Sequence, residues 1–409
     1  MNRVVVTGMG ALTPIGNSVP EFWENAVNGV NGIDRITRFD TTNLKYKFAG
    51  EVKNVDFTGV IEKSQLRKMD LFTQYALYAA DEAVKDSGIV GNVDETRFGV
   101  YFGTGVGGLG TFCADHTTLL EKGARRVSPF FIPKMIVNIA AGNIAIKYHA
   151  HGVNMCVSTA CATGATAIGE AYRAIKHGYA DAVICGGSEA TINPLAAAGF
   201  GNMKALSTAE TKETASIPFD KRRSGFVLGE GGAALVLEEY EHAKARGAKI
   251  YAEVAGYGAT CDAYHVTSPD PEAVYTANAV KEAMKDIPEV EADKIYINAH
   301  GTSTHYNDLT ETRTFKNVFG SDAYKLHISS IKSMTGHMLG AAGAIEAITA
   351  INTLRTGIVP PTINYVEHDE ECDLDYTPNN AVETPIELAL STNLGFGGHN
   401  TCLAFTAVK

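Results

Sequence analysis

Short β-branched and aromatic apolar runs alternate along the chain with longer stretches of helical periodicity. The strand-like runs cover residues 4–7, 98–102, 181–185, 233–237, 295–298, 327–330 and 388–391. Clear helical patterns cover residues 69–87, 164–177 and 276–286. This alternation predicts a layered α/β fold in which helices cover the sheets.

Two of the helical segments repeat one another. Residues 164–178 read GATAIGEAYRAIKHG and residues 343–357 read GAIEAITAINTLRTG, and each ends on a glycine. Two buried Ala-rich helices can look alike through composition alone, but we interpret the pair as a duplicated architecture whose halves meet at an active site. The length of 409 residues suits two fused halves, here residues 1–250 and 251–409.

Three reactive side chains each follow an apolar run and precede small residues. Cys161 lies in VSTACATG, where a helix begins, and the helix N-terminus predicts a lowered thiol pKa and a nucleophile. His300 in NAHGTST and His337 in KSMTGH occupy the same setting. A single cysteine or histidine is more often structural. Together they predict strand ends that converge on one crevice and perform acyl transfer.

Composition narrows the class of protein. A net charge of −11 argues against broad nucleic-acid binding. The 7 scattered cysteines form no C-x-x-C pair, which argues against a disulfide scaffold or zinc site and predicts a reducing compartment. We find no signal peptide and no run of about 18 apolar residues, so we expect a cytoplasmic protein without membrane insertion.

Glycine-rich and histidine-rich segments offer weaker signals. Residues 103–108 (GTGVGG) match G-x-G-x-x-G, but no acidic strand end follows about 20 residues later, so we reject nicotinamide binding. Residues 395–398 (GFGG) predict a mobile loop whose backbone N–H groups can approach a reacting oxygen. His149 and His151 are interpreted as part of a loop rather than as a metal pair.

Four motifs now carry a family resemblance: STACATG, NAHGTST, KSMTGHMLGAAG and GFGGHN, in this order. With them the chain resembles, end to end, the β-ketoacyl-acyl-carrier-protein synthases of the thiolase-like fold, and synthase II most closely. The resemblance implies a five-layer αβαβα sandwich of duplicated halves and a homodimer. It implies decarboxylative condensation of malonyl-acyl carrier protein (malonyl-ACP) with an acyl chain from acyl-ACP, yielding β-ketoacyl-ACP and CO2 in type II fatty acid elongation.

The resemblance also implies roles for individual residues. Cys161 matches the nucleophile that takes the acyl chain, and His300 and His337 match the pair that acts on malonyl. Phosphopantetheine arrives on the carrier protein, so no cofactor or metal of its own is expected. Further matches are a buried charged pair that orders the histidines (Lys332, Glu346), phosphopantetheine-binding threonines (Thr302, Thr304), a gating residue whose N–H joins that of Cys161 in an oxyanion hole (Phe396), and a pocket-lining branched aliphatic typical of type II (Val106).

Some positions depart from the family or match it weakly. His305 stands where the family often has proline, and Leu394 where it often has phenylalanine, which bears on gating and chain length. A monovalent cation near Asn298, Glu346 and Ser391 is a weak match to relatives. By analogy, a basic patch for the acidic carrier protein consists of Lys63, Arg67, Lys68, Arg125, Arg126 and Lys204, which can equally be ordinary solvated charges.

Three alternative functions belong to different classes. A degradative thiolase usually has two cysteines at its site rather than two histidines after the nucleophile. A non-catalytic chain-length partner lacks the nucleophile, whereas Cys161 is present. A ketosynthase for polyketide or other specialised acyl chains is the serious rival, and sequence alone does not separate it from fatty acid synthesis.

Overall fold

The structure, a computed structural model, describes residues 1–408. Ten strands form one continuous mixed sheet in the order β11-β10-β14-β15-β9-β1-β8-β6-β4-β5. Their bounds are β1 (Val4–Leu12), β4 (Phe98–Gly103), β5 (Asn154–Met155), β6 (Ala182–Glu189), β8 (Gly231–Glu239), β9 (Ala252–Cys261), β10 (Ile295–Asn298), β11 (His327–Ser329), β14 (Leu388–Gly395) and β15 (His399–Thr406).

The strand order is mirrored about the junction of β1 and β9. On either side, three outer strands run parallel to one another, and the two inner strands run antiparallel to their neighbours. Strands β1 and β9 join through only two residue pairs, Val5 with Glu253 and Val6 with Ala252. The mirrored order is the one that a duplicated unit produces, as the repeated helices predicted.

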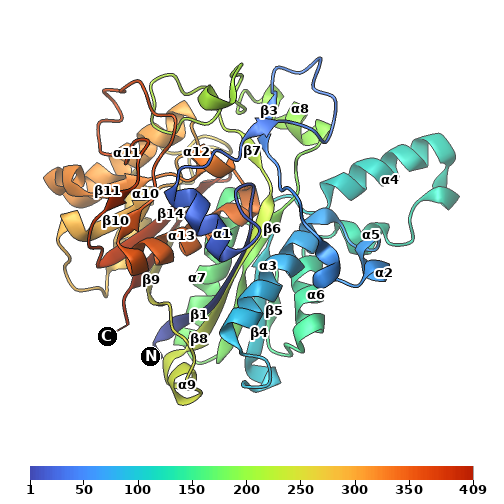
Figure 1. Cartoon of the computed structure of the whole chain (residues 1–409), viewed down its shortest axis with the longest axis horizontal. Helices are drawn as coiled ribbons and strands as arrows, with labels where there is room; N and C mark the ends of the chain where they lie inside the picture. The colour runs from blue at the N-terminus through green and yellow to red at the C-terminus, as the bar shows by residue number, and fades with distance from the viewer. Residues whose placement is uncertain (409) are drawn as a thin grey trace.

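The two halves of the sheet enclose a pair of central helices (Figure 1). Helices α7 (Thr163–Lys176) and α13 (Ala342–Thr356) contact each other and strands of both halves. Helices α3 (Leu71–Ser87) and α6 (Ile139–Tyr148) cover the other face of the N-terminal half. Helix α10 (Val274–Met284), with α11 (His305–Phe319) against it, covers the other face of the C-terminal half. The predicted five-layer αβαβα sandwich is confirmed.

The remaining helices and strands lie outside the ten-stranded sheet and the helices that cover it. Helix α4 (Leu109–Lys122) projects from the body at the right of Figure 1. Among the described residues, no helix is both long and apolar enough to cross a membrane. The other helices are α1 (Val19–Val27), α2 (Lys63–Leu66), α5 (Phe131–Met135), α8 (Pro194–Asn202), α9 (Tyr240–Ala245) and α12 (Lys332–Thr335), and the other strands are β2 (Asp34–Arg35), β3 (Phe48–Gly50), β7 (Leu228–Gly229), β12 (Ile358–Val359) and β13 (Val382–Glu383).

Glycine lets the central helices touch. A Cβ on Gly164 would lie 2.7 Å from the backbone nitrogen of Ala344, and a Cβ on Gly343 would lie 2.5 Å from that of Ala165. Both distances are shorter than van der Waals contact, so a larger residue at either place would push the helices apart. The two contacts are reciprocal, and they hold the N-terminal ends of α7 and α13 against each other.

Glycine also explains where the sequence-based strands were incomplete. The apolar run of β1 is interrupted at Gly8, yet the strand continues to Leu12. Gly8 lies directly against the backbone of α3, where a side chain would not fit. Strand β9 was missed for this reason, whereas β15, which contains no glycine, was missed because polar residues occupy its first half. In β9, Gly256 and Gly258 pack against the backbone of α10 in the same way. Such glycines weaken the alternating pattern that predicts a strand, although close helix packing requires them.

Candidate active site

The nucleophile lies on a tight turn at the start of α7. Ala160 adopts a left-handed backbone conformation (φ 51°), which turns the chain sharply before Cys161. Residues Ala160–Ala162 form a short 3-10 turn that leads into the helix, and Cys161 is 9 % exposed. Strand β14 ends against this turn, because a Cβ on Gly395 would lie 2.5 Å from the carbonyl oxygen of Thr159. The turn therefore fixes the sulfur beside the GFGG segment.

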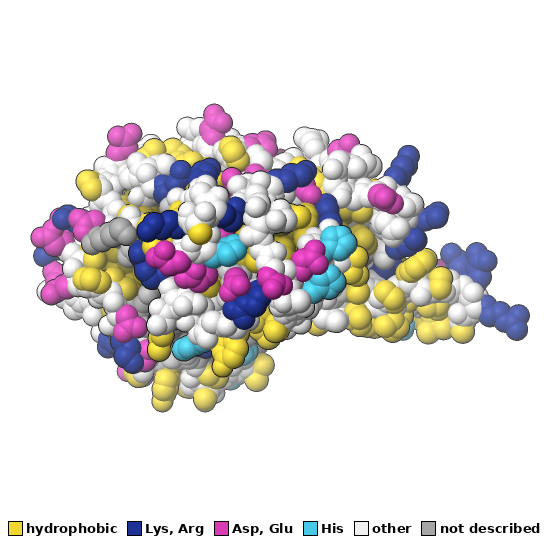
Figure 2. Space-filling model, turned by 90° about the horizontal axis from the view of Figure 1, so that it is seen from below, with side chains coloured by type: hydrophobic (Ala, Val, Ile, Leu, Met, Phe, Trp, Pro, Cys, Tyr) yellow, Lys and Arg dark blue, Asp and Glu magenta, His cyan; other side chains and the backbone are white. Residues whose placement is uncertain are grey.

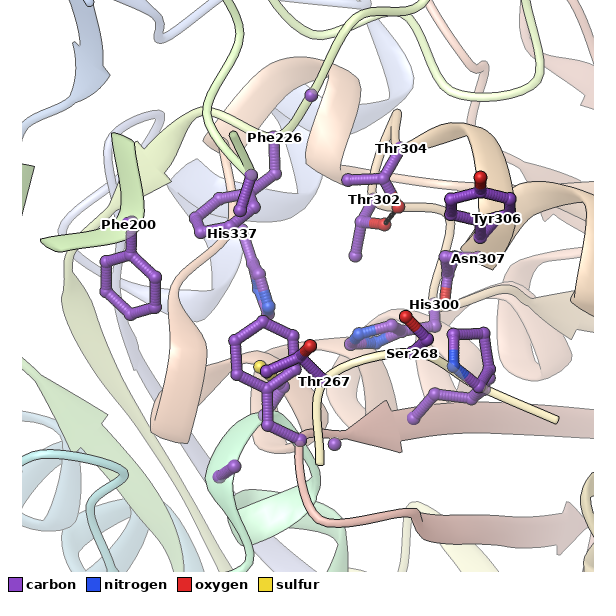
Figure 3. A pocket seen from close by; sticks show the side chains of 18 of the residues that line it. Phe200, Phe226, Thr267, Ser268, His300, Thr302, Thr304, Tyr306, Asn307 and His337 are labelled. Carbon is purple, nitrogen blue, oxygen red and sulfur yellow. Dashed lines mark hydrogen bonds between the residues drawn. The ribbon is translucent and has the colours of Figure 1, made fainter. Parts of the chain in front are cut away.

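Two histidines complete a compact cluster with this cysteine. The sulfur of Cys161 and a ring nitrogen from each of His300 and His337 all lie within 4.8 Å of one another. His300 follows the end of β10, and His337 follows α12. Their ring centroids are 5.1 Å apart and the rings are nearly perpendicular. Figure 3 shows both rings directed toward the same space. The predicted convergence of the three reactive side chains is confirmed.

Hydrogen bonds at Nδ1 set the tautomer of each histidine. The backbone N–H of Leu339 donates to Nδ1 of His337 at 3.3 Å, and Nζ of Lys332 donates to Nδ1 of His300 at 3.2 Å. Each Nδ1 is thus an acceptor, so the ring proton is on Nε2. Burial lowers the pKa of both histidines well below the usual 6.5, and the Lys332 charge acts in the same direction. The cluster therefore presents two neutral N–H donors.

A buried ion pair lies behind the histidines. Lys332 and Glu346 are almost fully buried and form a salt bridge. Nδ2 of Asn393 donates to the other oxygen of Glu346 and lies 3.4 Å from Nδ1 of His300. Burial raises the pKa of Glu346, while the Lys332 ammonium opposes that rise. Sequence reasoning missed Asn393, although its place just before the GFGG segment was a usable signal.

The expected low pKa of the cysteine is wrong for the protein in this state. Burial raises the pKa of the Cys161 thiol to about 12. The Lys332 charge and the backbone N–H of Phe396, which hydrogen-bonds the sulfur, act against that rise. The helix N-terminus favours the thiolate, but the loss of water around the sulfur disfavours it more strongly. The resting cysteine is a neutral thiol.

The cluster lies in a cavity of about 570 Å³. The hydroxyls of Thr302 and Thr304 lie side by side on one wall of the cavity (Figure 3), 2.9 Å apart. Val106 and Phe396 also line the cavity. Leu394 and His305 likewise line it. The structure thus brings the residues expected to touch substrate together in one cavity.

Two buried carboxylates that sequence reasoning missed organise the loops. Glu189 accepts hydrogen bonds from the backbone N–H groups of Gly105 (2.8 Å) and Gly340 (3.0 Å), among others. Glu311 accepts from those of His300 (2.7 Å) and Gly301 (2.6 Å). Burial raises the pKa of both carboxyls to about 7. The backbone N–H groups of the GTGVGG loop donate to Glu189, so this loop binds a carboxylate of the protein itself.

The other predicted residues, Lys204 excepted, lie outside the cavity lining. Asn298 and Ser391 are neighbours in the pairing of β10 with β14, and Asn298 Oδ1 and Ser391 Oγ are buried without a hydrogen-bond partner. Of the basic patch, only Lys204 lines the cavity. Lys and Arg side chains gather at the projecting end of the molecule in Figure 2. The rest of the patch is on or beside α2 (Lys63, Arg67, Lys68) and after α4 (Arg125, Arg126).

Fold and site together define a class of protein. A cysteine beside two neutral imidazoles, in a cavity lined by residues of both halves, is the arrangement expected of an enzyme that transfers acyl groups through a covalent thioester. Family models then match most of the chain: the β-ketoacyl synthase N-terminal domain over residues 1–243 and the C-terminal domain over residues 251–366. The chain belongs to the β-ketoacyl synthase family of condensing enzymes.

Individual relatives agree with this assignment. The chain is 52 % identical over 404 residues to the 3-oxoacyl-[acyl-carrier-protein] synthase 2 of Staphylococcus aureus (strain N315), covering 98 % of each chain. A β-ketoacyl synthase from Burkholderia phymatum STM815 superposes with a TM-score of 0.91 at 36 % identity, over the full length of both chains. One chain of the complex AntDE:AntF, described as a type II polyketide synthase acyl-carrier protein with its ketosynthase bound to the hexaketide, also superposes over the full length of both chains, with a TM-score of 0.90 at 36 % identity.

Proposed function

We propose that this chain condenses malonyl-ACP with an acyl chain held on Cys161, giving β-ketoacyl-ACP and CO2 in type II fatty acid elongation. The observation that carries the proposal is the placement of the Cys161 sulfur within 4.8 Å of two neutral imidazole nitrogens. The 52 % identity to a protein named 3-oxoacyl-[acyl-carrier-protein] synthase 2 supports the substrate class.

In the first step the Cys161 sulfur attacks the thioester of acyl-ACP. The new C–S bond forms as the bond to pantetheine breaks, and the thiol proton leaves with the departing pantetheine thiol. The exchange therefore balances one thioester and one thiol on each side. The backbone N–H groups of Cys161 and Phe396 stabilise the tetrahedral oxyanion, a role supported by the hydrogen bond from Phe396 to the sulfur.

In the second step malonyl-ACP loses CO2 and the electron pair left behind forms an enolate. Its oxygen accepts hydrogen bonds from Nε2 of His300 and Nε2 of His337, each donor being worth about 3 kcal/mol in the transition state. The carbanion then attacks the acyl carbon, the C–C bond forms as the bond to the Cys161 sulfur breaks, and the departing thiolate takes up a proton from solvent. Neutral donors suit this step, because an imidazolium would protonate the carbanion before it attacks.

Other residues support these steps without taking part in bond changes. Lys332 and Glu346 position His300, Thr302 and Thr304 bind the pantetheine arm, and Phe396 gates the cavity beside Val106. No resident cofactor or metal enters the reaction. A monovalent cation near Asn298, Glu346 and Ser391 remains a proposal, supported by the unpartnered oxygens Asn298 Oδ1 and Ser391 Oγ.

The proposed partners are acyl-ACP, malonyl-ACP and a second copy of the chain. The carrier protein would dock on the basic patch (Lys63, Arg67, Lys68, Arg125, Arg126, Lys204). A homodimer is supported by β5, the outermost strand of the sheet, and by exposed apolar side chains near it, including Ile146 and Val153. We further propose that residues 1–250 and 251–409 are the two halves, and that the protein works in the cytoplasm, in keeping with its 7 free cysteines.

A polyketide ketosynthase is the second candidate, favoured by the superposition on the AntDE:AntF complex. Intact-protein mass spectrometry tests both. The protein is incubated with hexadecanoyl-ACP or shorter acyl-ACPs, and malonyl-ACP follows. Fatty acid elongation predicts an acyl adduct on Cys161 that malonyl-ACP discharges as one β-ketoacyl-ACP. Repeated extension of the β-keto product would favour the polyketide function, and absence of any adduct would contradict both.

A further inference from the structure

One part of the cavity lining has no role in the reaction described above. His305 and Tyr306 line the cavity and are exposed, in contrast to the buried Cys161 at its floor. Lys204 also lines the cavity and is exposed. These side chains therefore belong to the mouth, where a long substrate arm would still be near solvent.

His305 is the first residue of α11, a helix of 15 residues. The residue before it, Thr304, does not cap the helix with its side chain, because its hydroxyl pairs with that of Thr302 at 2.9 Å. The N–H groups of the first turn therefore lack a side-chain acceptor. Unpaired N–H groups and the helix dipole favour an anion at such an end.

A buried arginine fixes the His305 ring at this place. Nη2 of Arg223 donates to Nδ1 of His305 at 3.4 Å and to the His305 carbonyl oxygen at 3.3 Å. The Arg223 side chain is only 1 % exposed, with Asp369 bonded to its Nη1 and Asp308 3.6 Å from its Nε. Since Nδ1 of His305 is the acceptor, the ring proton is on Nε2, which is left as a donor.

The one carboxylate among the described residues that line the cavity does not compete for these donors. Asp262 also lines the cavity. However, Asn400 Nδ2 donates to its Oδ1 at 2.6 Å, and the backbone N–H of Asp270 donates to its Oδ2 at 3.1 Å. The mouth thus combines an imidazole N–H, the Lys204 ammonium and an uncapped helix N-terminus in one cavity with Cys161.

We propose that His305, with Lys204 and the first turn of α11, binds the phosphodiester of the phosphopantetheine arm while the thioester reaches Cys161. This inference rests on the proposed function, which brings that arm into the cavity. A phosphodiester carries one negative charge and two free oxygens, which suit an N–H donor and an ammonium. His305 is a specificity residue for the phosphorylated arm and takes no part in bond changes.

Two thioesters that differ only in the phosphate test the proposal. Acyl-phosphopantetheine and acyl-pantetheine of the same chain length are each given to the wild-type protein, and the second-order rate of Cys161 acylation is followed by mass spectrometry. The expected result is at least tenfold faster acylation by the phosphorylated thioester. His305→Gln and His305→Pro should each reduce this ratio at least threefold, and the proline variant suits the first position of a helix.

The controls separate this proposal from the proposed function. His151→Gln alters an exposed histidine distant in sequence from this mouth and should keep the wild-type ratio, whereas Lys204→Gln should reduce it. Equal rates for the two thioesters in the wild type, or a wild-type ratio in both His305 variants, would overturn the phosphate subsite and leave the acyl transfer intact. Failure of both thioesters and of acyl-ACP to acylate Cys161 would instead contradict the proposed function.

Discussion

The two halves of the molecule contain the same turn with different chemistry. In the N-terminal half Ala160 has a φ of 51° and precedes Cys161, and in the C-terminal half Leu339 has a φ of 46° and precedes Gly340. Each begins a 3-10 turn that leads into a central helix, α7 or α13. Cys161 lines the cavity with its thiol, whereas Gly340 donates its N–H to Glu189 at 3.0 Å. The turn belongs to the duplicated frame, and a single side chain decides whether it is reactive.

The central helices that follow the two turns, α7 and α13, also differ in one chemically important side chain. Three residues after the crossing glycine, α13 has Glu346 and α7 has Ala167. Glu346 pairs with Lys332, which in turn holds His300, so the C-terminal half supplies the charged groups and the donors. The N-terminal half supplies the sulfur. Division of the chemistry between halves explains why the site lies at the junction of α7 and α13.

Removal of the Cys161 sulfur, the group that distinguishes the N-terminal turn from its C-terminal counterpart, should have the largest effect on activity. Cys161→Ala should abolish the acyl-enzyme and lower condensation by 10³-fold or more, because no other group forms the covalent bond. Intact-protein mass spectrometry and product formation measure both effects. Cys156→Ala is the matched control, since this cysteine precedes the same turn. An acyl adduct persisting in Cys161→Ala would place the nucleophile elsewhere.

Loss of the buried ion pair between Lys332 and Glu346 should slow condensation more than acylation of Cys161. The double variant Lys332→Met, Glu346→Gln removes the donor to His300 without leaving a lone buried charge. Condensation should fall about 10²-fold because the imidazole loses its orientation. Rapid-quench measurement should find a smaller loss in Cys161 acylation. Lys294→Met, which removes a half-buried, ion-paired lysine outside the cavity lining, is the control. Equal losses in both steps would argue for a general structural defect.

The two reciprocal glycines, Gly164 and Gly343, should contribute equally to the free energy of unfolding. Gly164→Ala and Gly343→Ala each place a methyl group against the opposite helix, and each should lower the free energy of unfolding by about 1–3 kcal/mol. Urea denaturation measures the change. Gly142→Ala in α6 is the control, because nothing lies within 4 Å of its added Cβ, and it should be neutral or slightly stabilising. Destabilisation by only one of these two alanine substitutions would contradict the equivalence of the two helix contacts.

The smallest effect is a dependence of stability on pH. His300 and His337 stay neutral when folded, but take up protons below about pH 6.5 when unfolded. The unfolded state then binds more protons, so these residues lower the free energy of unfolding as the pH falls, by about 1 kcal/mol between pH 7 and 6. Glu189 and Glu311 act oppositely, since their raised pKa stabilises the folded state at low pH and that contribution is lost as the pH rises through about 7.

The histidine contribution is isolated by difference. The free energy of unfolding of the wild type minus that of the variant His300→Asn, His337→Asn should fall by about 1 kcal/mol between pH 7 and 6, because the two carboxyls contribute equally to both proteins. Denaturant titration at each pH measures the difference. His116→Asn, His151→Asn changes two histidines outside the cavity lining and should match the wild type. Identical pH slopes in all three proteins would mean that the active-site histidines are accessible to protons when folded.

The sequence predicted the parts of the molecule that have a local signature. Strands such as β4 and β10 are uninterrupted apolar runs, and Cys161, His300 and His337 each follow such a run or precede a small-residue helix. Glu189 was not predictable in this way. It binds a loop 84 positions earlier and Gly340 151 positions later, so its role exists only in three dimensions. The Cys161 pKa was wrong for the same reason, because desolvation depends on what surrounds the sulfur.

The narrow junction between β1 and β9 has a consequence for the order in which the two halves can be encoded. Thr406 pairs with Glu253, and Glu253 pairs with Val5, so the first and last strands are separated by one strand. A short linker could join the end of β15 to the start of β1, and a new start in the loop before β9, near Gly247, would interrupt no strand. A circularly permuted chain that reads the histidine half before the cysteine half should therefore fold to the same enzyme. The catalytic arrangement requires that the halves meet, and either half can be synthesised first.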